Sequence, residues 1–147
     1  MRVVIQRSKS SNVSVGNKTV GKIEKGLCIL VGFTQEDTEN DIDYIVKKTI
    51  NLRIFDDEKG IMNKSILEAG GTILSVSQFT LYADTKKGNR PSYSKAMKGD
   101  SAIKLYNLFN QKLKEYVKVE TGVFGAEMLV NIENDGPITI LIDSKEK

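Results

Sequence analysis

Two short polar segments interrupt otherwise apolar stretches of this chain, and their side chains could do chemistry. Residues 77–81 read Ser-Gln-Phe-Thr-Leu, and residues 134–139 read Asn-Asp-Gly-Pro-Ile-Thr. The chain contains no histidine. This absence removes the Ser-His-Asp and Cys-His nucleophile schemes and the usual general base near neutral pH. A reaction at these segments would therefore depend on hydroxyl, amide and backbone groups.

The first segment ends an apolar stretch, residues 72–81, that we predict to be a β-strand. Strand alternation would place Gln78 and Thr80 on one face, and Ser77 and Phe79 on the other. Polar side chains at the end of an apolar strand need hydrogen-bond partners. Two interpretations stay open: the hydroxyls bond to neighbouring backbone as the strand leaves the core, or these residues form a rim of donors around a ligand.

The second segment is centred on a Gly-Pro pair. Pro137 has no N–H and restricts the backbone of Gly136. We therefore expect carbonyl oxygens here that do not all accept hydrogen bonds from a neighbouring strand. Exposed carbonyls can accept hydrogen bonds from an amine. The alternative is an ordinary hairpin turn over Asp135-Gly136-Pro137, which this composition also favours.

Composition sets the outer bounds of the interpretation. With 147 residues, of which 39% are hydrophobic, we expect one domain over residues 1–147 with one core. No apolar run reaches the roughly 20 residues that span a bilayer, and the first residues do not resemble a signal peptide, so we expect a cytoplasmic protein. The net charge of +3 permits an anionic partner without requiring one.

Neither a metal nor a cofactor is expected. The acidic residues of the stretch 56–60 are adjacent and point different ways, which is typical of a solvated loop rather than a metal site. The single cysteine, Cys28, lies inside an apolar run, where burial would keep its thiol protonated and inert.

Runs of strands with two inserted helices predict an α+β fold. We expect a mostly antiparallel sheet or incomplete barrel with two main helices packed on it. One helix should begin at a capping box formed by Thr38 and Asp41, and the other should follow Asp100 or Ser101 and extend over 102–117. The predicted strands cover residues 2–6, 12–15, 19–23, 27–33, 72–81, 128–132 and 138–142.

Five motifs, spread over essentially the whole chain, resemble the D-aminoacyl-tRNA deacylase (D-tyrosyl-tRNA deacylase) family. They are Val4-Ile5-Gln6-Arg7, Val76-Ser77-Gln78-Phe79-Thr80-Leu81, Gly88-Asn89-Arg90-Pro91-Ser92, Phe124-Gly125-Ala126-Glu127-Met128 and Asn134-Asp135-Gly136-Pro137-Ile138-Thr139. One conservative departure is Ile138, where the family often carries valine. The resemblance implies a homodimeric enzyme that hydrolyses the ester between a D-amino acid, or glycine, and tRNA.

The resemblance also implies roles for individual residues. The Gly136-Pro137 peptide bond should be cis and should enter the active site of the partner subunit, where its carbonyls accept from the substrate ammonium and exclude L side chains. This filter should be indifferent to the D side chain and should admit glycine, including glycine mischarged on tRNA(Ala). Asn134, Met128 and Arg7 complete the expected substrate site, with Met128 near the adenosine and Arg7 holding the partner's Gly-Pro carbonyls. As alternatives, Met128 is an inward strand residue and Arg7 closes a strand end with a carboxylate.

The catalytic residues are expected among Ser77, Gln78, Phe79 and Thr80. Backbone N–H groups of Phe79 and Thr80 would hold the developing oxyanion, while Ser77 and Gln78 order the loop or contact the terminal adenosine. Phe79 either stacks on adenine or belongs to the core. Thr80 is either a covalent nucleophile or a residue that positions the substrate while the ribose hydroxyl assists the reaction. The sequence contains no evident base that would activate the Thr80 hydroxyl.

A basic stretch and two rival functions complete the predictions. Five cations and no acid lie within residues 85–99, so this stretch either follows the acceptor-stem phosphates or is merely solvated. Recognition of the tRNA 3′ end and of shape is expected rather than base-specific readout. The rival functions are a non-catalytic RNA-binding module and a general esterase with Thr80 as nucleophile.

Overall fold

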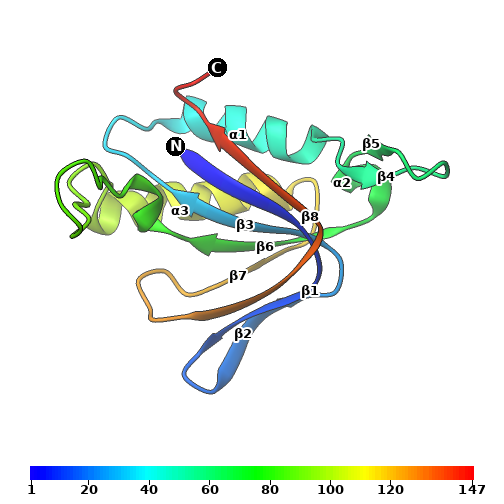
Figure 1. The fold of residues 1–147 in the computed structure, drawn as a ribbon, viewed down its shortest axis with the longest axis horizontal. Helices are drawn as coiled ribbons and strands as arrows, with labels where there is room; N and C mark the ends of the chain where they lie inside the picture. Colours follow the sequence, from blue (N-terminus) through cyan, green and yellow to red (C-terminus); the bar gives the residue numbers. More distant parts are fainter.

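A mixed β-sheet, nearly closed into a barrel and flanked by helices, forms the fold in the computed structural model, which describes residues 1–147 (Figure 1). The six strands of this sheet are β1 (Arg2–Val15), β2 (Lys18–Ile23), β3 (Gly26–Gly32), β6 (Thr72–Ser77), β7 (Val119–Thr121) and β8 (Leu129–Asp143). A small hairpin pairs β4 (Phe55–Asp56) with β5 (Met62–Lys64). The helices are α1 (Glu39–Asn51), α2 (Ile66–Ala69), the 3₁₀-helix η1 (Phe79–Tyr82) and α3 (Gly99–Lys114).

Strand β1 organises the sheet because it pairs with three other strands. One edge of β1 carries β8 along most of its length, from Arg2 opposite Asp143 to Ser14 opposite Leu129. The other edge is shared by β3, which pairs with residues 2–8, and by β2, which pairs with residues 11–15. All three of these pairs are antiparallel, and the β1–β2 pair contains the strands predicted over 12–15 and 19–23.

The remaining two pairs are parallel, so the sheet is mixed, although most of its strand pairs are antiparallel as expected. Strand β3 pairs in parallel with β6, and β6 pairs in parallel with β7. The two main helices explain this arrangement, since α1 lies between β3 and β6 in the chain and α3 lies between β6 and β7. A parallel pair requires such a crossover connection, whereas a tight turn can join only antiparallel strands.

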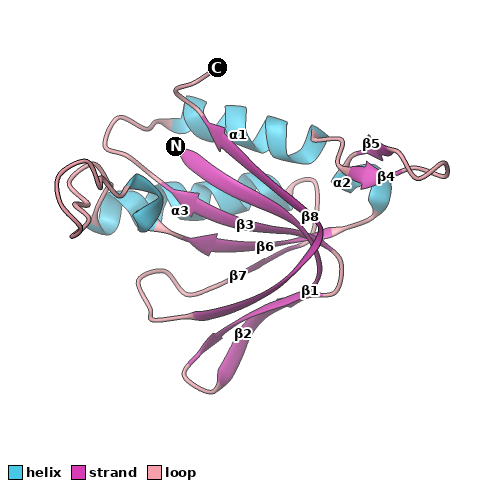
Figure 2. Ribbon diagram, viewed as in Figure 1, coloured by secondary structure: helices cyan, strands magenta, loops and turns pink.

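Both main helices pack against one face of the sheet, as predicted (Figure 2). The core contains side chains of β1, β3 and β6 together with α1 and α3, and Phe109 and Ile42 are among its fully buried members. Strand β3 is buried on both faces, as its unbroken apolar run predicts. None of the helices has the length and apolarity needed to cross a bilayer.

The helix start predicted from the sequence is confirmed for α1, whereas the predicted limits of α3 are shifted. The Asp41 carboxylate accepts from the Thr38 backbone N–H at 2.9 Å, which is the predicted capping box. Helix α3 begins at Gly99 and ends at Lys114, rather than covering 102–117. The apolar spacing misleads at its end because Val117 packs on the same core after the helix has finished.

Two strand predictions are wrong. The strand predicted over 72–81 ends at Ser77, and the chain continues as η1, so residues 78–81 have no strand alternation. The segment around Gly136-Pro137 is not a turn between two strands, because β8 continues through it while staying paired with β1. Residues 52–71, where the sequence pattern is weak, contain the β4–β5 hairpin and α2.

The free thiol of Cys28 is structural, as predicted. Cys28 is buried in a second apolar cluster with Val13, Leu74 and Val76, and burial raises the pKa of its thiol to about 12. The thiolate is therefore absent near neutral pH, and the thiol is a poor nucleophile.

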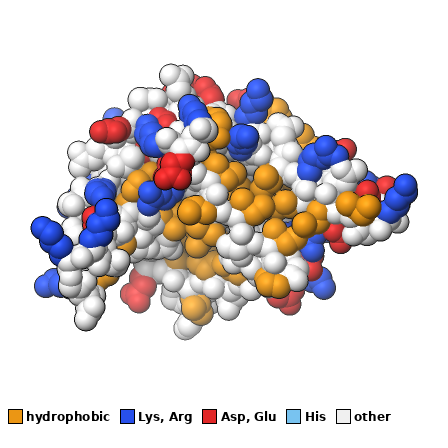
Figure 3. Space-filling model, turned by 45° about the horizontal axis from the view of Figure 1, so that its top comes forward, with side chains coloured by type: hydrophobic (Ala, Val, Ile, Leu, Met, Phe, Trp, Pro, Cys, Tyr) orange, Lys and Arg blue, Asp and Glu red, His pale blue; other side chains and the backbone are white.

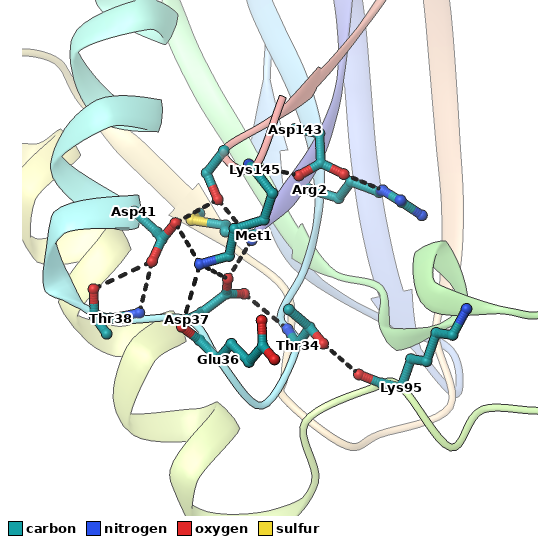
Figure 4. Close-up of polar contacts among 11 residues, drawn as sticks. Met1, Arg2, Thr34, Glu36, Asp37, Thr38, Asp41, Lys95, Asp143 and Lys145 are labelled. Atoms are coloured by element: carbon teal, nitrogen blue, oxygen red, sulfur yellow. Dashed lines mark hydrogen bonds and ion pairs between the residues drawn. The ribbon is translucent and has the colours of Figure 1, made fainter. Parts of the chain in front are cut away.

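A network of charged groups joins both ends of the chain to the start of α1 (Figure 4). The Met1 amino group donates to the buried Asp37 carboxylate and to the Ser144 hydroxyl. Asp41 accepts from Ser144 at 2.7 Å and from Lys145 at 2.9 Å. Burial alone would raise the pKa of Asp41, but these bonds and the Thr38 N–H together hold that pKa below its ordinary value.

We predict that the Asp41 network makes the fold acid-sensitive. Because the folded-state pKa of Asp41 is depressed, its contribution to stability is complete above the unfolded-state pKa near 3.8 and is lost as pH falls below that value. Asp41→Asn should lower the free energy of unfolding at pH 7 by about 1–3 kcal/mol and flatten its decline below pH 4. Urea unfolding at several pH values measures both effects. Asp100→Asn, an exposed change on α3, is the control, and an equal slope in all three proteins would contradict the prediction.

Candidate active site

A pocket of about 270 Å³ lies where the neighbouring strands β3 and β6 end. The parallel register places Val31 opposite Ser77, so the two strands finish at the same edge of the sheet. The first turn of α3 and the loop between β7 and β8 close the other sides. The wall is mainly apolar and is formed by Val31, Gly32, Phe33, Val76, Ser77, Gln78, Phe79, Met97, Ala102, Phe124, Gly125, Ala126, Met128 and Val130.

Four of the predicted site residues meet at this pocket. Ser77, Gln78, Phe79 and Met128 all contribute to its wall. The Phe79 ring is 55% exposed and makes an edge-to-face contact with Tyr93, with ring centroids 5.0 Å apart. Phe79 is therefore a residue of the pocket rim and not of the core, which leaves an aromatic face accessible to a flat ligand.

The pocket rim has its shape because the chain leaves the ladder at Gln78. The Gln78 N–H still donates to the Val31 carbonyl at 2.7 Å, and its own carbonyl then accepts from the Leu81 N–H as η1 begins. Gly32 makes this close turn feasible, since a Cβ at position 32 would lie 2.8 Å from the Gln78 carbonyl oxygen. The first backbone N–H groups of a helix have no partner inside it, and in η1 these belong to Phe79 and Thr80.

The Thr80 side chain is engaged by its neighbour. Its hydroxyl accepts a hydrogen bond from the Gln78 side-chain amide, and Thr80 is not among the residues of the pocket wall. An amide N–H is a donor and cannot remove the hydroxyl proton. This hydrogen bond therefore does not activate the Thr80 hydroxyl as a nucleophile.

The Gly-Pro segment is a bulge of β8. Ser8 of β1 pairs with Asn134, and Gln6 pairs with Thr139, so four residues of β8 project between two positions that β1 separates by only one residue. The Asn134 side chain closes the base of this bulge, accepting from the Ile138 N–H at 3.1 Å and donating to the Thr139 hydroxyl at 2.9 Å. Both Gly136 and Pro137 are exposed, and the peptide bond between them is cis.

Arg7 supports the bulge from beneath. Its guanidinium donates to the Asp135 carbonyl at 3.2 Å and to the Ile54 carbonyl at 2.9 Å, and it pairs with the carboxylates of Asp135 and Asp56. Arg7 is almost fully buried, so these charge-assisted bonds hold the bulge firmly. In this structure Arg7 thus contacts the residue before its own chain's Gly136-Pro137.

Within one chain the two motifs do not meet. Gly136, Pro137 and Asn134 contribute nothing to the pocket wall, and Asp135 and Arg7 instead border a separate polar cleft. In Figure 1 the middle of β8 lies where the strands cross at the right, whereas β6 ends at the left. The pocket and the Gly-Pro bulge are therefore at opposite ends of the sheet.

Several pocket residues were not singled out from the sequence. Phe124 and Ala126 belong to a motif that carries the family resemblance, so that motif could have indicated them. Phe33 follows β3, Met97 precedes α3 and Ala102 lies in α3, and none of the three belongs to a motif. They enter the site only through the crossover topology, which brings α3 and the end of β3 together.

Comparisons with known proteins show the family of this chain. The family model described as D-Tyr-tRNA(Tyr) deacylase matches residues 4–143, and the chain belongs to this family. It is 57% identical over 148 residues to the D-aminoacyl-tRNA deacylase of Thermosipho melanesiensis, with 99% of both chains covered. It is 55% identical to the D-aminoacyl-tRNA deacylase of Thermus aquaticus, with 100% of this chain and 97% of the relative covered.

A solved structure is similar over nearly the whole fold. The c-Myc DNA Unwinding Element Binding Protein superposes with a TM-score of 0.92 at 39% identity, covering 97% of this chain and 98% of that one. Family membership and this superposition together identify the chain as an enzyme of the deacylase class, with the fold that the motifs predict.

We predict that Gly32→Ala disturbs the pocket rim. The added Cβ meets the Gln78 carbonyl oxygen at 2.8 Å, so the backbone of residues 78–82 must shift, at a cost of about 1–3 kcal/mol in the free energy of unfolding. Urea unfolding and the amide NMR shifts of residues 78–82 measure the effect. In the control Gly16→Ala, whose Cβ meets no atom within 4 Å, only the left-handed backbone is strained, and the shifts of residues 78–82 should not move. Unmoved shifts in Gly32→Ala would contradict the prediction.

Proposed function

We propose that this protein hydrolyses the ester that joins a D-amino acid to the 3′ end of tRNA. The observation that carries the proposal is the identity of 57% to a D-aminoacyl-tRNA deacylase over 99% of the chain, with two of the five family motifs lining the pocket. The products are free tRNA and the amino acid. The activity belongs in the cytoplasm, where aminoacyl-tRNA is made and used.

The pocket binds the terminal adenosine in this proposal. A nucleoside offers a flat apolar base and polar edges, and the pocket offers apolar walls with the exposed Phe79 ring at the rim and the polar side chains of Ser77 and Gln78 beside it. Stacking of a base on an aromatic ring contributes about 1–3 kcal/mol. Met128 packs against the base from the β8 side of the same wall.

The chemical step needs little catalytic assistance from the protein because an aminoacyl ester is already activated. Attack by water, or assistance from the neighbouring ribose hydroxyl, converts the ester carbonyl oxygen into an oxyanion. The backbone N–H groups of Phe79 and Thr80 hold that oxyanion, and orientation supplies the remaining acceleration. This route needs no imidazole, which agrees with the absence of histidine.

Chiral selection comes from Gly136-Pro137 of a second copy of this chain. Since a chain's own bulge lies at the opposite end of the sheet from its own pocket, a complete site requires the bulge of a partner. The exposed carbonyls of the bulge accept from the substrate ammonium and occupy the space into which an L side chain would project. Arg7 and Asn134 keep the bulge in shape.

A homodimer is consistent with the surface of the sheet. Leu141 of β8 is 62% exposed on the sheet face opposite the helices, next to Val4 of β1. Figure 3 shows hydrophobic side chains gathered in a band across the middle of one face of the molecule. Such a contiguous apolar area is typical of an interface between proteins.

The proposed filter also defines the substrate range. Exclusion by backbone atoms rejects L side chains without reading D side chains, because nothing in the bulge contacts a particular side-chain type. Glycine has no side chain to exclude, so Gly-tRNA, including glycine mischarged on tRNA(Ala), should be hydrolysed as well. The enzyme should therefore accept D-aminoacyl esters with chemically diverse side chains and reject L-aminoacyl esters.

The deciding experiment is single-turnover deacylation of D-tyrosyl-tRNA, L-tyrosyl-tRNA and Gly-tRNA at fixed salt. We expect rapid loss of the D and glycyl esters, with the L ester intact. Equal hydrolysis of the D and L esters would indicate a general esterase. Hydrolysis of none of the three substrates would indicate a non-catalytic RNA-binding module. Either result would overturn the proposal.

We further predict that the Thr80 hydroxyl is not the nucleophile of the reaction. Thr80→Val keeps the branched shape and removes the hydroxyl, so a positioning role predicts a single-turnover rate lowered by at most about 10²-fold. Loss of a true nucleophile would remove nearly all of the enzymatic acceleration. The D-tyrosyl-tRNA rate, measured beside Thr80→Ser as the control that restores a hydroxyl, separates the two roles. A complete loss in Thr80→Val with recovery in Thr80→Ser would make Thr80 the nucleophile.

A further inference from the structure

The loop of residues 85–99, termed the basic loop, concentrates the positive charge of the molecule. It holds five cations and no acid, namely Lys86, Lys87, Arg90, Lys95 and Lys98. Because the whole chain has a net charge of only +3, the remaining residues are net acidic. The positive potential is therefore local to this loop and is not a general property of the surface.

Most of these cations have no acidic partner. Lys95 pairs with Asp84 at 3.2 Å, whereas no ion pair joins Lys86, Lys87, Arg90 or Lys98 to a carboxylate. All four side chains are exposed, and Figure 3 shows a group of basic side chains at the left end of the molecule, where Figure 1 places this loop. Their charges are thus free to meet an anion.

The basic loop is fixed to the rim of the pocket. Tyr93 contacts the Phe79 ring, and the Met97 N–H donates to the Phe33 carbonyl at 2.8 Å, with Phe79, Met97 and Phe33 all in the pocket wall. At the base of the loop, Asp84 and Ser92 exchange backbone hydrogen bonds of 2.8 and 2.9 Å. The unpaired cations are therefore held beside the pocket opening.

We propose that the basic loop binds backbone phosphates of the tRNA as the strand leaves the pocket. This inference rests on the proposed function, since it takes the terminal adenosine to occupy the pocket. Lysine ammonium groups bind phosphate as point charges, without reading bases, which suits an enzyme that must accept many tRNAs. The loop thus contributes affinity and salt dependence, while the pocket and the Gly-Pro bulge contribute chemistry and handedness.

The test compares two matched double variants. Lys86→Gln with Lys87→Gln removes two adjacent cations of the basic loop, and Lys47→Gln with Lys48→Gln removes two adjacent exposed cations of α1, outside that loop. For each, the enzyme concentration that gives half-maximal single-turnover deacylation of D-tyrosyl-tRNA is measured between 50 and 200 mM salt. A second substrate, 3′-O-D-tyrosyl-adenosine, contains the ester and the nucleoside but no phosphate.

The loop variant should need about tenfold more enzyme for half-maximal rate on the tRNA substrate, and its logarithmic salt slope should be shallower by roughly 1.5. The α1 variant should match the unmodified protein on tRNA, and the two variants should not differ on the adenosine ester. Equal salt slopes for the two variants on tRNA would overturn the proposal for the loop. Failure of the unmodified protein to hydrolyse either ester would instead overturn the proposed function.

Discussion

The pairing of β1 with β8 is the constraint on which the rest of the structure depends. It joins the two ends of the chain across the full length of the sheet, and the charged network of Asp37, Asp41 and Lys145 secures the ends. It also creates the Gly-Pro bulge, since four residues of β8 must project where β1 supplies only one between its paired positions. Bulges of this kind redirect a segment of a strand while the ladder continues on both sides. The same ladder that stabilises the fold therefore presents Gly136-Pro137 to the outside.

The second constraint is the parallel pairing of β3 with β6, which brings the two strand ends to one edge. Apolar residues dominate that edge, so the pocket suits a base or nucleoside better than a charged group. The polar groups that remain are side chains and backbone of a short turn, held by the close approach of Gly32 to the Gln78 carbonyl. In the proposed mechanism, a site built in this way orients a reactive ester and stabilises an oxyanion, without a histidine as general base.

Local signals in the sequence predicted much of this structure. The capping box of Thr38 and Asp41 marks the start of α1, and the unbroken apolar run marks β3 as a buried strand, because both signals depend on neighbouring residues alone. The register of β8 on β1 and the parallel pairs depend on residues far apart in the chain, so alternation could not reveal them. For the same reason the motifs singled out Ser77, Gln78, Phe79 and Met128, which line the pocket, but not Met97 or Ala102, which line it as well.

The central claim is that the pocket of one chain and the Gly136-Pro137 bulge of another complete one site. Mixed assemblies test it most directly, using Gln78→Ala to impair the pocket and Pro137→Ala to impair the bulge. We expect the co-refolded mixture to hydrolyse D-tyrosyl-tRNA faster than either variant alone, because a mixed dimer contains one site in which both parts are intact. A rate for the mixture equal to the mean of the two separate variants would contradict the claim.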